Sequence, residues 1–370
     1  MTSTVLEPSK RRTAERNAAI EAITSTLGRV NRRIFTLLAA LIPILVLGII
    51  GSVVTVPFVA LGPGPTFNTL GEVNGKEVVE VRGAPIDPTA GNLNMTTVSV
   101  RDQLNIFEAL GLWVDGQHGL VPRAEVYPPG VSRDEIDKSN QQDFKDSEDN
   151  AELAALHYLK MPTVVRLRAV TEDGPAKDVL RKGDELVTVD GKPISTSKDV
   201  VAAVSSAKPG SAIPVVFRRD GAEQTAEITL GARPDDSGKG YLGITPGEFA
   251  SGPLQVDFNL AEIGGPSAGL MFTLALIDKL TPGELSGNKF VAGTGTIDTD
   301  GKVGPIGGIQ YKMIAAHEAG AQTFLVPAAN CNEAAQRTPD GLRLVKVENL
   351  AGAVQSLDDI DAGKETSSCS

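Results

Sequence analysis

Two residues in the C-terminal part of the chain have the types and surroundings needed to hydrolyse a peptide bond, and the first is Ser267. It follows Gly264-Gly265-Pro266 and precedes an apolar run from Leu270 to Leu280, which predicts a buried helix. Thr281-Pro282-Gly283 ends that helix, and the proline before Ser267 suits its first turn. Ser267 is therefore expected at the helix N-terminus, where unpaired backbone N–H groups and the helix dipole favour a developing negative charge.

The second residue is Lys312, on a helix predicted from about Ile309 to Ala319 and closed by Gly320. The face it shares with residues one and two turns further on carries only small side chains, at Ala315, Ala316 and Ala319. A lysine on such a face can be packed away from water, which lowers its pKa and lets it act as a base. A serine paired with a buried lysine is a known hydrolytic nucleophile. Taken singly, a serine at a helix start is most often only a helix cap, and a lysine in the first turns of a helix is usually solvated.

The sequence around both residues closely resembles the proteolytic domain of the Lon protease family. The resemblance covers about the last third of the chain and rests on specific motifs, which are Pro266-Ser267-Ala268-Gly269, Gly293-Thr294-Gly295-Thr296-Ile297-Asp298, Pro305-Ile306-Gly307-Gly308 and Ala315-Ala316-His317. It implies that Ser267 is the nucleophile and Lys312 the general base. Because Lon-type domains usually form rings, the resemblance also implies that a homo-oligomeric ring, such as a hexamer, is compatible with this sequence.

Small residues beside Ser267 are expected to support catalysis, namely Gly264, Gly265 and Ala268. Backbone N–H groups in this stretch are candidates for binding an oxyanion, and the glycines let a substrate backbone approach closely. One position departs from the family pattern. The hydroxyl residue beside the catalytic lysine aligns with Asp298, and a carboxylate there would raise the pKa of the lysine and oppose its use as a base.

Composition argues against several other classes of function. The chain has 370 residues and a formal net charge of −11, without a basic cluster, so nucleic acid is not an expected partner. Its three histidines are scattered, and Cys331 and Cys369 are not spaced like metal ligands, so neither a metal site nor a disulfide framework is implied. No Gly-x-x-x-x-Gly-Lys-Ser/Thr loop occurs, so we expect no ATPase module and no cofactor.

An uncharged segment runs from Ile34 to Leu70, and its core at residues 34–61 is long enough to cross a membrane. The alternative is a cleaved signal peptide, but the apolar run far exceeds a signal core and follows a long polar stretch. Seven basic residues precede it: Lys10, Arg11, Arg12, Arg16, Arg29, Arg32 and Arg33. By the positive-inside rule, residues 1–33 are expected to be a cytoplasmic tail, and the bulk of the chain to lie outside the cell membrane on a single-pass signal anchor.

The middle of the chain has a different pattern. Residues 161–232 resemble a PDZ domain of the kind found in bacterial proteases, most specifically from Gly183 to Gly191. Such domains bind extended or C-terminal peptides by adding a strand to a sheet edge. Tyr241-Leu242-Gly243-Ile244 looks like a carboxylate-binding loop, but it falls after this stretch and is expected to be a strand of the next domain. A mixed α/β domain without peptide affinity is the alternative.

Residues 62–160 are predicted to contain two strands and two helices, at 77–81, 93–100, 104–112 and 151–159. Trp113 is expected in a core. Ser132 and Glu135 are spaced as a capping box, but the polar stretch that follows predicts a solvated surface, with Asn150 capping the second helix.

Few residues separate the PDZ-like stretch from Ser267, whereas much of the Lon-type fold precedes the nucleophile in the family. Residues 62–160 are available to supply the missing strands. We therefore predict that the PDZ-like domain is inserted into the proteolytic domain, which resumes at residues 233–359 and ends in a disordered tail at 360–370. The alternative is three sequential modules, with residues 62–160 as a separate linker domain.

One anchor, a PDZ-like part and a Lon-like part together resemble the bacterial family of membrane-anchored PDZ-containing Lon-like proteases. The resemblance implies an α+β architecture, with a ribosomal protein S5 domain 2-like fold for the proteolytic part. The expected activity is ATP-independent serine endopeptidase cleavage of peptides or unfolded proteins. A membrane-tethered PDZ scaffold or regulator is the alternative, although it would need neither Ser267 nor Lys312. A tail-processing protease ranks lower, because no nucleophile stretch of that type is present.

Overall fold

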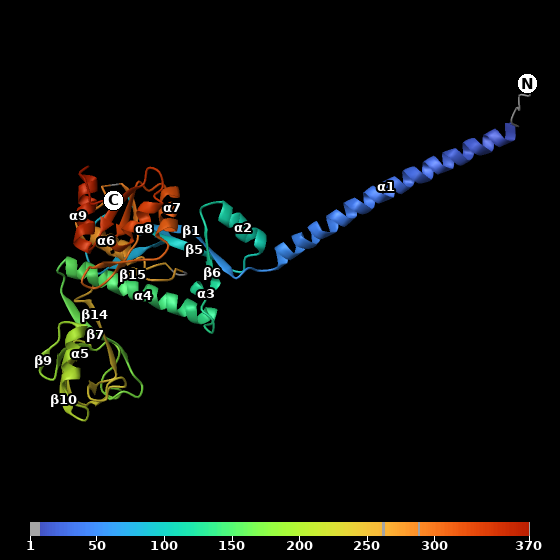
Figure 1. Ribbon diagram of the computed structural model, residues 1–370. Helices are drawn as coiled ribbons and strands as arrows, with labels where there is room; N and C mark the ends of the chain where they lie inside the picture. The colour runs from blue at the N-terminus through green and yellow to red at the C-terminus, as the bar shows by residue number, and fades with distance from the viewer. Residues whose placement is uncertain (1–7, 261–262, 288, 370) are drawn as a thin grey trace, which may run out of the picture. The chain divides into compact units, whose positions relative to one another are not determined.

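The computed structural model describes residues 8–260, 263–287 and 289–369 (Figure 1). The chain divides into two compact units. The first comprises Met1–Ala60 and Val100–Val126, and the second comprises Leu61–Ser99 and Tyr127–Ser370.

The first unit is mostly helical. It contains α1 (Pro8–Val53), α2 (Ile106–Val114), α3 (Arg123–Val126) and the short strand β6 (Gly119–Pro122). Within α1, Phe35–Val53 is the one segment among the described residues that is long and apolar enough to cross a membrane, with a mean hydropathy of 2.5.

Two predictions for this unit need correction. The membrane segment was expected to reach residue 61, but α1 ends at Val53 and β1 (Phe58–Asn68) follows, with Val59 and Ala60 fully buried. The uncharged run is longer than the helix because a buried strand is as apolar as a membrane span. Trp113, expected in a core, is 63% exposed on α2.

The second unit is built on a sheet in which the strands follow the order β20-β19-β16-β5-β1. Its strands β5 (Asn92–Arg101), β16 (Phe290–Gly293), β19 (Thr323–Pro327) and β20 (Arg343–Val347) form parallel pairs in this order. Parallel neighbours need crossover connections, and α7 (Ile309–Glu318) and α8 (Cys331–Gln336) lie in those that lead to β19 and β20. One sheet thus combines strands that precede and follow the middle of the chain.

A helical layer packs beside this sheet and forms the main core. It consists of α4 (Arg133–Tyr158), α6 (Gly269–Leu280) and α9 (Leu350–Asp361). Phe144 of α4 meets Phe272 of α6 edge to face, with ring centroids 5.7 Å apart. The predicted capping box of Ser132 and Glu135 is present, but it starts one helix of 26 residues. Asn150 is therefore inside α4, and the stretch expected to be solvated buries Phe144, Ser147 and Glu148.

The middle of the chain forms a second sheet with its own core, in the order β11-β10-β8-β7-β14. Its elements are β7 (Thr163–Val170), β8 (Glu185–Val189), α5 (Ser197–Ser206), β10 (Ala212–Arg219), β11 (Ala222–Thr229) and β14 (Ile244–Ala250). The predicted boundary at residue 232 is too early, because β14 pairs with β7 along its whole length and is the edge strand of this sheet. The remaining short elements are β2 (Glu72–Val73), β3 (Lys76–Glu77), β4 (Val79–Arg82), β9 (Lys192–Pro193), β12 (Gly231–Ala232), β13 (Gly240–Tyr241), β15 (Gln255–Phe258), β17 (Thr296–Ile297), β18 (Val303–Gly304) and η1 (Ala328–Asn330).

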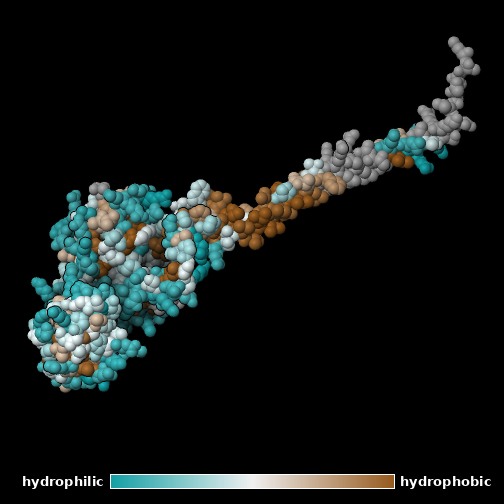
Figure 2. Space-filling view, turned by 60° about the horizontal axis from the view of Figure 1, so that its bottom comes forward, coloured by the Kyte–Doolittle hydropathy of each residue, from teal (hydrophilic) through white to brown (hydrophobic). Residues whose placement is uncertain are grey.

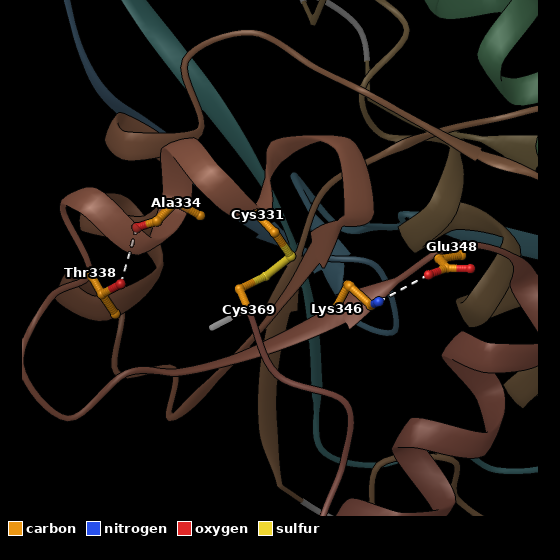
Figure 3. Close-up of a disulfide and its surroundings, with 6 residues drawn as sticks. All are labelled: Cys331, Ala334, Thr338, Lys346, Glu348 and Cys369. Atoms are coloured by element: carbon orange, nitrogen blue, oxygen red, sulfur yellow. Dashed lines mark hydrogen bonds and ion pairs between the residues drawn. A yellow bond between two sulfur atoms is a disulfide. The ribbon is translucent and has the colours of Figure 1, made fainter.

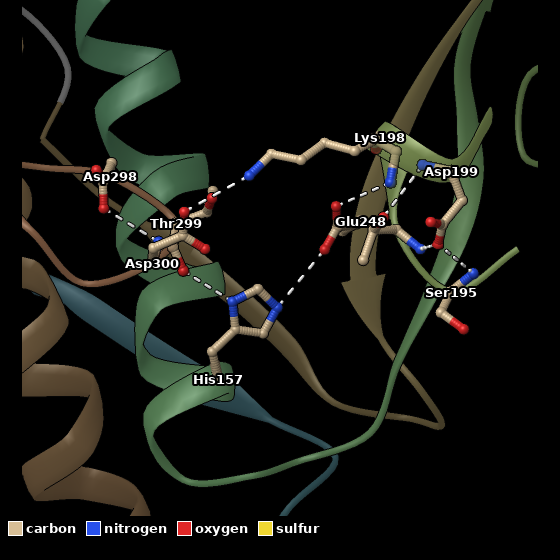
Figure 4. Close-up of polar contacts among 10 residues, drawn as sticks. His157, Ser195, Lys198, Asp199, Glu248, Asp298, Thr299 and Asp300 are labelled. Atoms are coloured by element: carbon tan, nitrogen blue, oxygen red, sulfur yellow. Dashed lines mark hydrogen bonds and ion pairs between the residues drawn. The ribbon is translucent and has the colours of Figure 1, made fainter. Parts of the chain in front are cut away.

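Polar contacts join the end of α4 to both neighbouring segments (Figure 4). The His157 ring lies between the carbonyl oxygen of Thr299, 2.7 Å from Nδ1, and the carboxylate of Glu248, 3.5 Å from Nε2. The same carboxylate accepts from the backbone N–H of Ser197 at the start of α5, at 2.9 Å. Glu248 therefore ties β14 to both helices.

The C-terminal tail differs from its prediction. Residues 360–370 were expected to be disordered, with no disulfide implied. Instead α9 continues to Asp361, and Cys369 forms a disulfide with Cys331 at the start of α8 (Figure 3). A backbone bridge between Val345 and Ser368 lays the tail beside β20. Spacing alone could not reveal the bond, because it depends on the tail folding back across the sheet.

Cys369→Ser should lower the free energy of unfolding by about 2–4 kcal/mol, because the disulfide removes conformational freedom from the unfolded chain. Denaturant titration of the detergent-solubilised chain measures the change. Reductant should destabilise the parent protein by a similar amount and leave Cys369→Ser unaffected. Equal stability of parent and variant under oxidising conditions would contradict this prediction.

Candidate active site

The structure brings three polar side chains together at the start of α6. Lys312 Nζ donates to Ser267 Oγ at 2.7 Å and to Thr294 Oγ1 at 2.9 Å. Thr294 Oγ1 in turn donates to the carbonyl oxygen of Ser267, at 3.1 Å. Ser267 and Lys312 are 45 positions apart in the sequence and are in direct contact. Thr294 also connects them, because its hydroxyl bonds both Lys312 Nζ and the Ser267 carbonyl oxygen.

Lys312 is the electrostatically unusual member of this group. Its side chain is buried, and burial lowers the pKa of its ammonium from the ordinary 10.5 to about 7. The two hydrogen-bond partners of Nζ are neutral hydroxyls, which compensate for lost water without adding a charge that would hold the proton. A substantial fraction of Lys312 is thus a neutral amine near neutral pH.

Lys312 is held by the first turn of α7. The helix starts after Gly308, whose left-handed backbone conformation (φ 68°) favours glycine. Just before it, Ile306 makes two reciprocal hydrogen bonds with the buried Asn330 side chain, at 3.0 and 2.9 Å. As the sequence indicated, Ala315 and Ala316 are buried with Lys312, whereas Ala319 is exposed. The loop and helix start are therefore fixed, so the amine is preorganised.

Ser267 lies in a turn that precedes α6, two residues before the first helical residue Gly269. Two residues of α4, seven positions apart and hence on one helix face, hold this turn. Ser147 Oγ donates to the carbonyl oxygen of Pro266 at 3.0 Å, and the Asn140 carbonyl oxygen accepts from the Gly265 N–H at 2.8 Å. On the other side, the Gly295 N–H donates to the Ser267 carbonyl oxygen at 3.0 Å. The nucleophile is thus positioned by long-range contacts.

Asp298 does not occupy the place predicted for it. Its carboxylate is exposed and accepts from the backbone N–H groups of Asp300 and Lys302, at 3.1 and 2.8 Å, within its own turn (Figure 4). The hydroxyl residue beside Lys312 is Thr294, four positions earlier. The alignment failed here because β17 and the turn after it carry the chain away from the lysine.

A pocket of about 680 Å³ opens beside the pair and is lined by both residues. Gly264, Gly265 and Ala268, which the sequence suggested as supporting residues, all line it. The Gly265 N–H, however, is committed to Asn140, so it is not available to a substrate oxygen. Gly265 also has a φ of +86°, which favours glycine at this turn.

Sequence reasoning missed Thr294, Asn140 and Ser147 as parts of this arrangement. A signal existed for Thr294, since a hydroxyl between two glycines follows directly after the buried strand β16. For Asn140 and Ser147 the signal was weak, because they lie in a highly charged stretch of α4. No group of three His, Cys, Asp or Glu side chains suited to a metal ion occurs among the described residues.

A second, smaller hollow of about 120 Å³ lies in the domain of residues 163–250, between α5 and the residues that lead into β14. Val200, Val201 and Val204 of α5 line one side, and Tyr241 to Ile244 line the other. The loop that resembled a carboxylate-binding loop therefore belongs to this domain and lines a groove beside its edge strand.

Comparisons with known proteins match two parts of the chain. Residues 136–230 match the family model of the PDZ domain, and residues 261–358 match that of the Lon protease (S16) C-terminal proteolytic domain. The chain therefore contains a PDZ domain and a Lon-type proteolytic domain, in a mixed helix and strand architecture, as predicted.

Relatives match over similar short ranges. A probable periplasmic serine endoprotease DegP-like of Pseudomonas fulva is 37% identical over 24% of this chain and 19% of its own length. The Lon protease of Roseiflexus castenholzii is 43% identical over 23% of this chain and 11% of its own. The solved PDZ domain of an SdrC-like protein from Listeria monocytogenes is 28% identical over 22% of this chain and 85% of its own, with a TM-score of 0.21. The chain thus spans less than a fifth of the length of these two curated relatives.

Proposed function

We propose that this chain, with its PDZ and Lon-type proteolytic domains, is a membrane-anchored serine endopeptidase whose catalytic pair is Ser267 and Lys312. The observation that carries the proposal is the 2.7 Å contact between Ser267 Oγ and a buried Lys312 amine, at the wall of a pocket. A scaffold without activity would have no physical reason to bury a lysine against a serine hydroxyl, because an unpaired buried ammonium destabilises the fold.

In this mechanism the neutral Lys312 amine accepts the Ser267 proton while Ser267 Oγ attacks the carbonyl carbon of the scissile peptide. The resulting ammonium then donates a proton to the leaving amine, and an acyl-enzyme remains on Ser267. Water attacks that ester while Lys312 accepts a proton from it, and the ammonium then returns the proton to Ser267 Oγ as the acid product leaves. A pKa of about 7 suits both halves of the cycle, because the amine must take up and release a proton at similar pH.

The developing oxyanion needs backbone donors. Gly265 is excluded by its bond to Asn140, so we assign this role to N–H groups of Ser267 and Ala268, which precede the first turn of α6 at the pocket wall. The positive end of the α6 dipole adds to the stabilisation.

Thr294 is a positioning residue in this mechanism. Thr294→Val keeps the side-chain shape but removes the hydroxyl that binds Nζ. It should lower kcat by roughly 10- to 100-fold, because the ammonium that forms on Lys312 as Ser267 loses its proton then lacks that hydrogen bond. Thr294→Ser keeps the hydroxyl and should retain most activity. Steady-state kinetics on a quenched fluorescent peptide decide between them, and a fully active Thr294→Val would refute this role.

Substrate peptides are proposed to bind the PDZ domain at the groove between α5 and β14. Because β14 is an edge strand, an extended peptide can add to the sheet there, with its C-terminal carboxylate at the loop from Tyr241 to Ile244. Arg233 lines the same groove; its Nε already pairs with Asp235 at 2.9 Å, so a ligand carboxylate would have to share or replace that pair.

Two features support an extracytoplasmic location for the proposed peptidase. Basic residues precede the apolar segment Phe35–Val53, which favours a cytoplasmic N-terminus. The disulfide between Cys331 and Cys369 favours an oxidising compartment for the proteolytic domain. We also propose that the PDZ domain is inserted into the proteolytic domain, since strands on both sides of it share one sheet.

The test is digestion of an unfolded protein such as casein by the purified full chain in detergent, with and without ATP. The proposal expects cleavage that is independent of ATP and absent in Ser267→Ala. If the parent protein cleaved no unfolded substrate, or if Ser267→Ala cleaved equally well, the alternative of a PDZ scaffold without proteolytic activity would be favoured instead.

A further inference from the structure

We propose that one face of α2 lies in the interfacial layer of the membrane that α1 spans, so that lipid covers it. The proposal rests on membrane anchoring by α1, which is part of the proposed function. It is independent of the chemistry at Ser267.

The helix α2 exposes an unusual amount of apolar surface. Glu108 is the only charged residue among its nine. Five large apolar side chains are between 41% and 69% exposed, namely Ile106, Phe107, Leu110, Trp113 and Val114. Their spacing places them on one side of the helix, over about a third of its circumference. On a protein surface facing water, such a face would be unfavourable.

A different side of α2 already packs inside its own unit. Ala109 is buried and Leu112 is half-buried, in a small cluster with Val56, Ala60 and Leu104. The exposed face is therefore a second apolar surface, in addition to the one that holds the helix in place. Both ends of α2 are also satisfied, by the capping box of Asn105 and Glu108 and by Asp115 at the C-cap.

The position of α2 beside the end of α1 indicates that lipid covers this face. The Phe107 ring packs against Gly51 in the last turn of α1, where an added Cβ would lie 2.6 Å from the ring. Just beyond α1, Thr55 forms a backbone bridge with Asn105, and the Val56 N–H donates to the Leu104 carbonyl oxygen at 2.8 Å. The start of α2 is thus fixed beside the C-terminal end of the apolar segment, where that segment leaves the hydrocarbon layer.

This level of the membrane suits the residues on the exposed face. Tryptophan is enriched at membrane–water interfaces, and short amphipathic helices bury Trp, Phe and Leu there. The apolar surface is also continuous with α1, since Val53 and Val54 are 73% and 48% exposed at the point where Phe107 meets the helix. Figure 2 shows the hydrophobic band of α1 reaching the apolar surface at the end of the helix. A second copy of this chain that covered α2 would also have to cover the apolar surface of α1 next to it, which the proposed membrane already covers.

The chain contains a single tryptophan, Trp113, so its intrinsic fluorescence reports on α2 alone. The experiment reconstitutes the full chain in phosphatidylcholine vesicles with brominated acyl chains. We expect blue-shifted Trp113 emission that bromines near the headgroup end quench most strongly, and that aqueous acrylamide quenches little. Flotation of the vesicles reports anchoring separately, and casein digestion reports proteolysis.

Two neighbouring substitutions provide a matched pair. Leu110→Asp places a charge on the exposed apolar face and should lose most of the lipid quenching. Gly111→Asp places the same charge one position away, in open space just outside the apolar face on the flank toward Glu108, and should retain more of it than Leu110→Asp. A chain that floats without lipid quenching of Trp113 overturns the proposal while anchoring stands. A blue shift that grows with protein density but not with bromine content also overturns it, because a second copy then covers α2. A chain that does not float overturns the proposal together with the anchor, whatever its peptidase activity.

Discussion

Ser267→Ala is expected to abolish turnover of an unfolded substrate, lowering kcat/KM by at least about 10³-fold. Lys312→Ala should have an effect of similar size, because the serine hydroxyl is a weak nucleophile without its base. Since the two residues act as one unit in contact at 2.7 Å, the double variant should be no worse than either single variant. Lys312→Arg should fail as well, because a guanidinium cannot be deprotonated in this pH range.

These variants need a control for folding, because both residues lie in or next to the core. Thermal unfolding of each variant should remain cooperative, and Lys312→Ala should not be less stable at neutral pH, since it removes a buried ionisable group. If Lys312→Arg kept most of its activity with casein, the general-base assignment would be wrong. Activity retained by Ser267→Ala would point to a contaminating protease.

The second large effect concerns pH. Lys312 must be neutral to accept the Ser267 proton, and burial lowers its pKa to about 7. Activity should therefore rise with pH through this value, and below it kcat/KM should fall about tenfold per pH unit as the ammonium form takes over. Activity falls at low pH because a protonated Lys312 cannot accept the Ser267 proton. A pH–rate profile on a peptide without titratable groups measures the midpoint.

Asp298→Asn tests whether the Asp298 carboxylate lies beside Lys312, as the sequence alignment predicted, or within its own turn, as in the structure. The sequence alignment placed a carboxylate beside Lys312, and its removal would then shift the midpoint to lower pH. Among the residues that the structure describes, that carboxylate accepts only from its own turn, and asparagine can replace it there. We therefore expect an unchanged midpoint, and a marked acid shift would restore Asp298 as a neighbour of Lys312.

Local motifs explain why part of the site could be read from the sequence. Helices predicted at residues 270–280 and 309–319 correspond to α6 (Gly269–Leu280) and α7 (Ile309–Glu318). Their apolar periodicity and terminal Gly and Pro residues are local signals. The motifs that carry Ser267 and Lys312 are local too, and the resemblance supplied the pairing. The predicted combination of PDZ and Lon-type domains is confirmed by the family matches.

The remaining parts depend on contacts that sequence spacing does not encode. Thr294 reaches Lys312 only because β16 ends beside α7, and Ser147 reaches Pro266 across 119 positions. The bond between Cys331 and Cys369 requires the tail to return to α8. β14 joins the second sheet by pairing with β7, although a gap in the strand pattern precedes it. Trp113 was assigned to a core because the chain has few aromatic residues, but it is 63% exposed on α2, where we propose that lipid covers it.

The central claim is that Ser267 is a nucleophile activated by Lys312, and covalent labelling tests it most directly. The purified chain is treated with a fluorophosphonate at pH values on both sides of 7, digested, and mapped by mass spectrometry. We predict a single adduct on the peptide that contains Ser267, forming faster above pH 7 and absent in Lys312→Arg. No adduct on that peptide, or equal labelling of Ser267 in Lys312→Arg, would contradict the assignment.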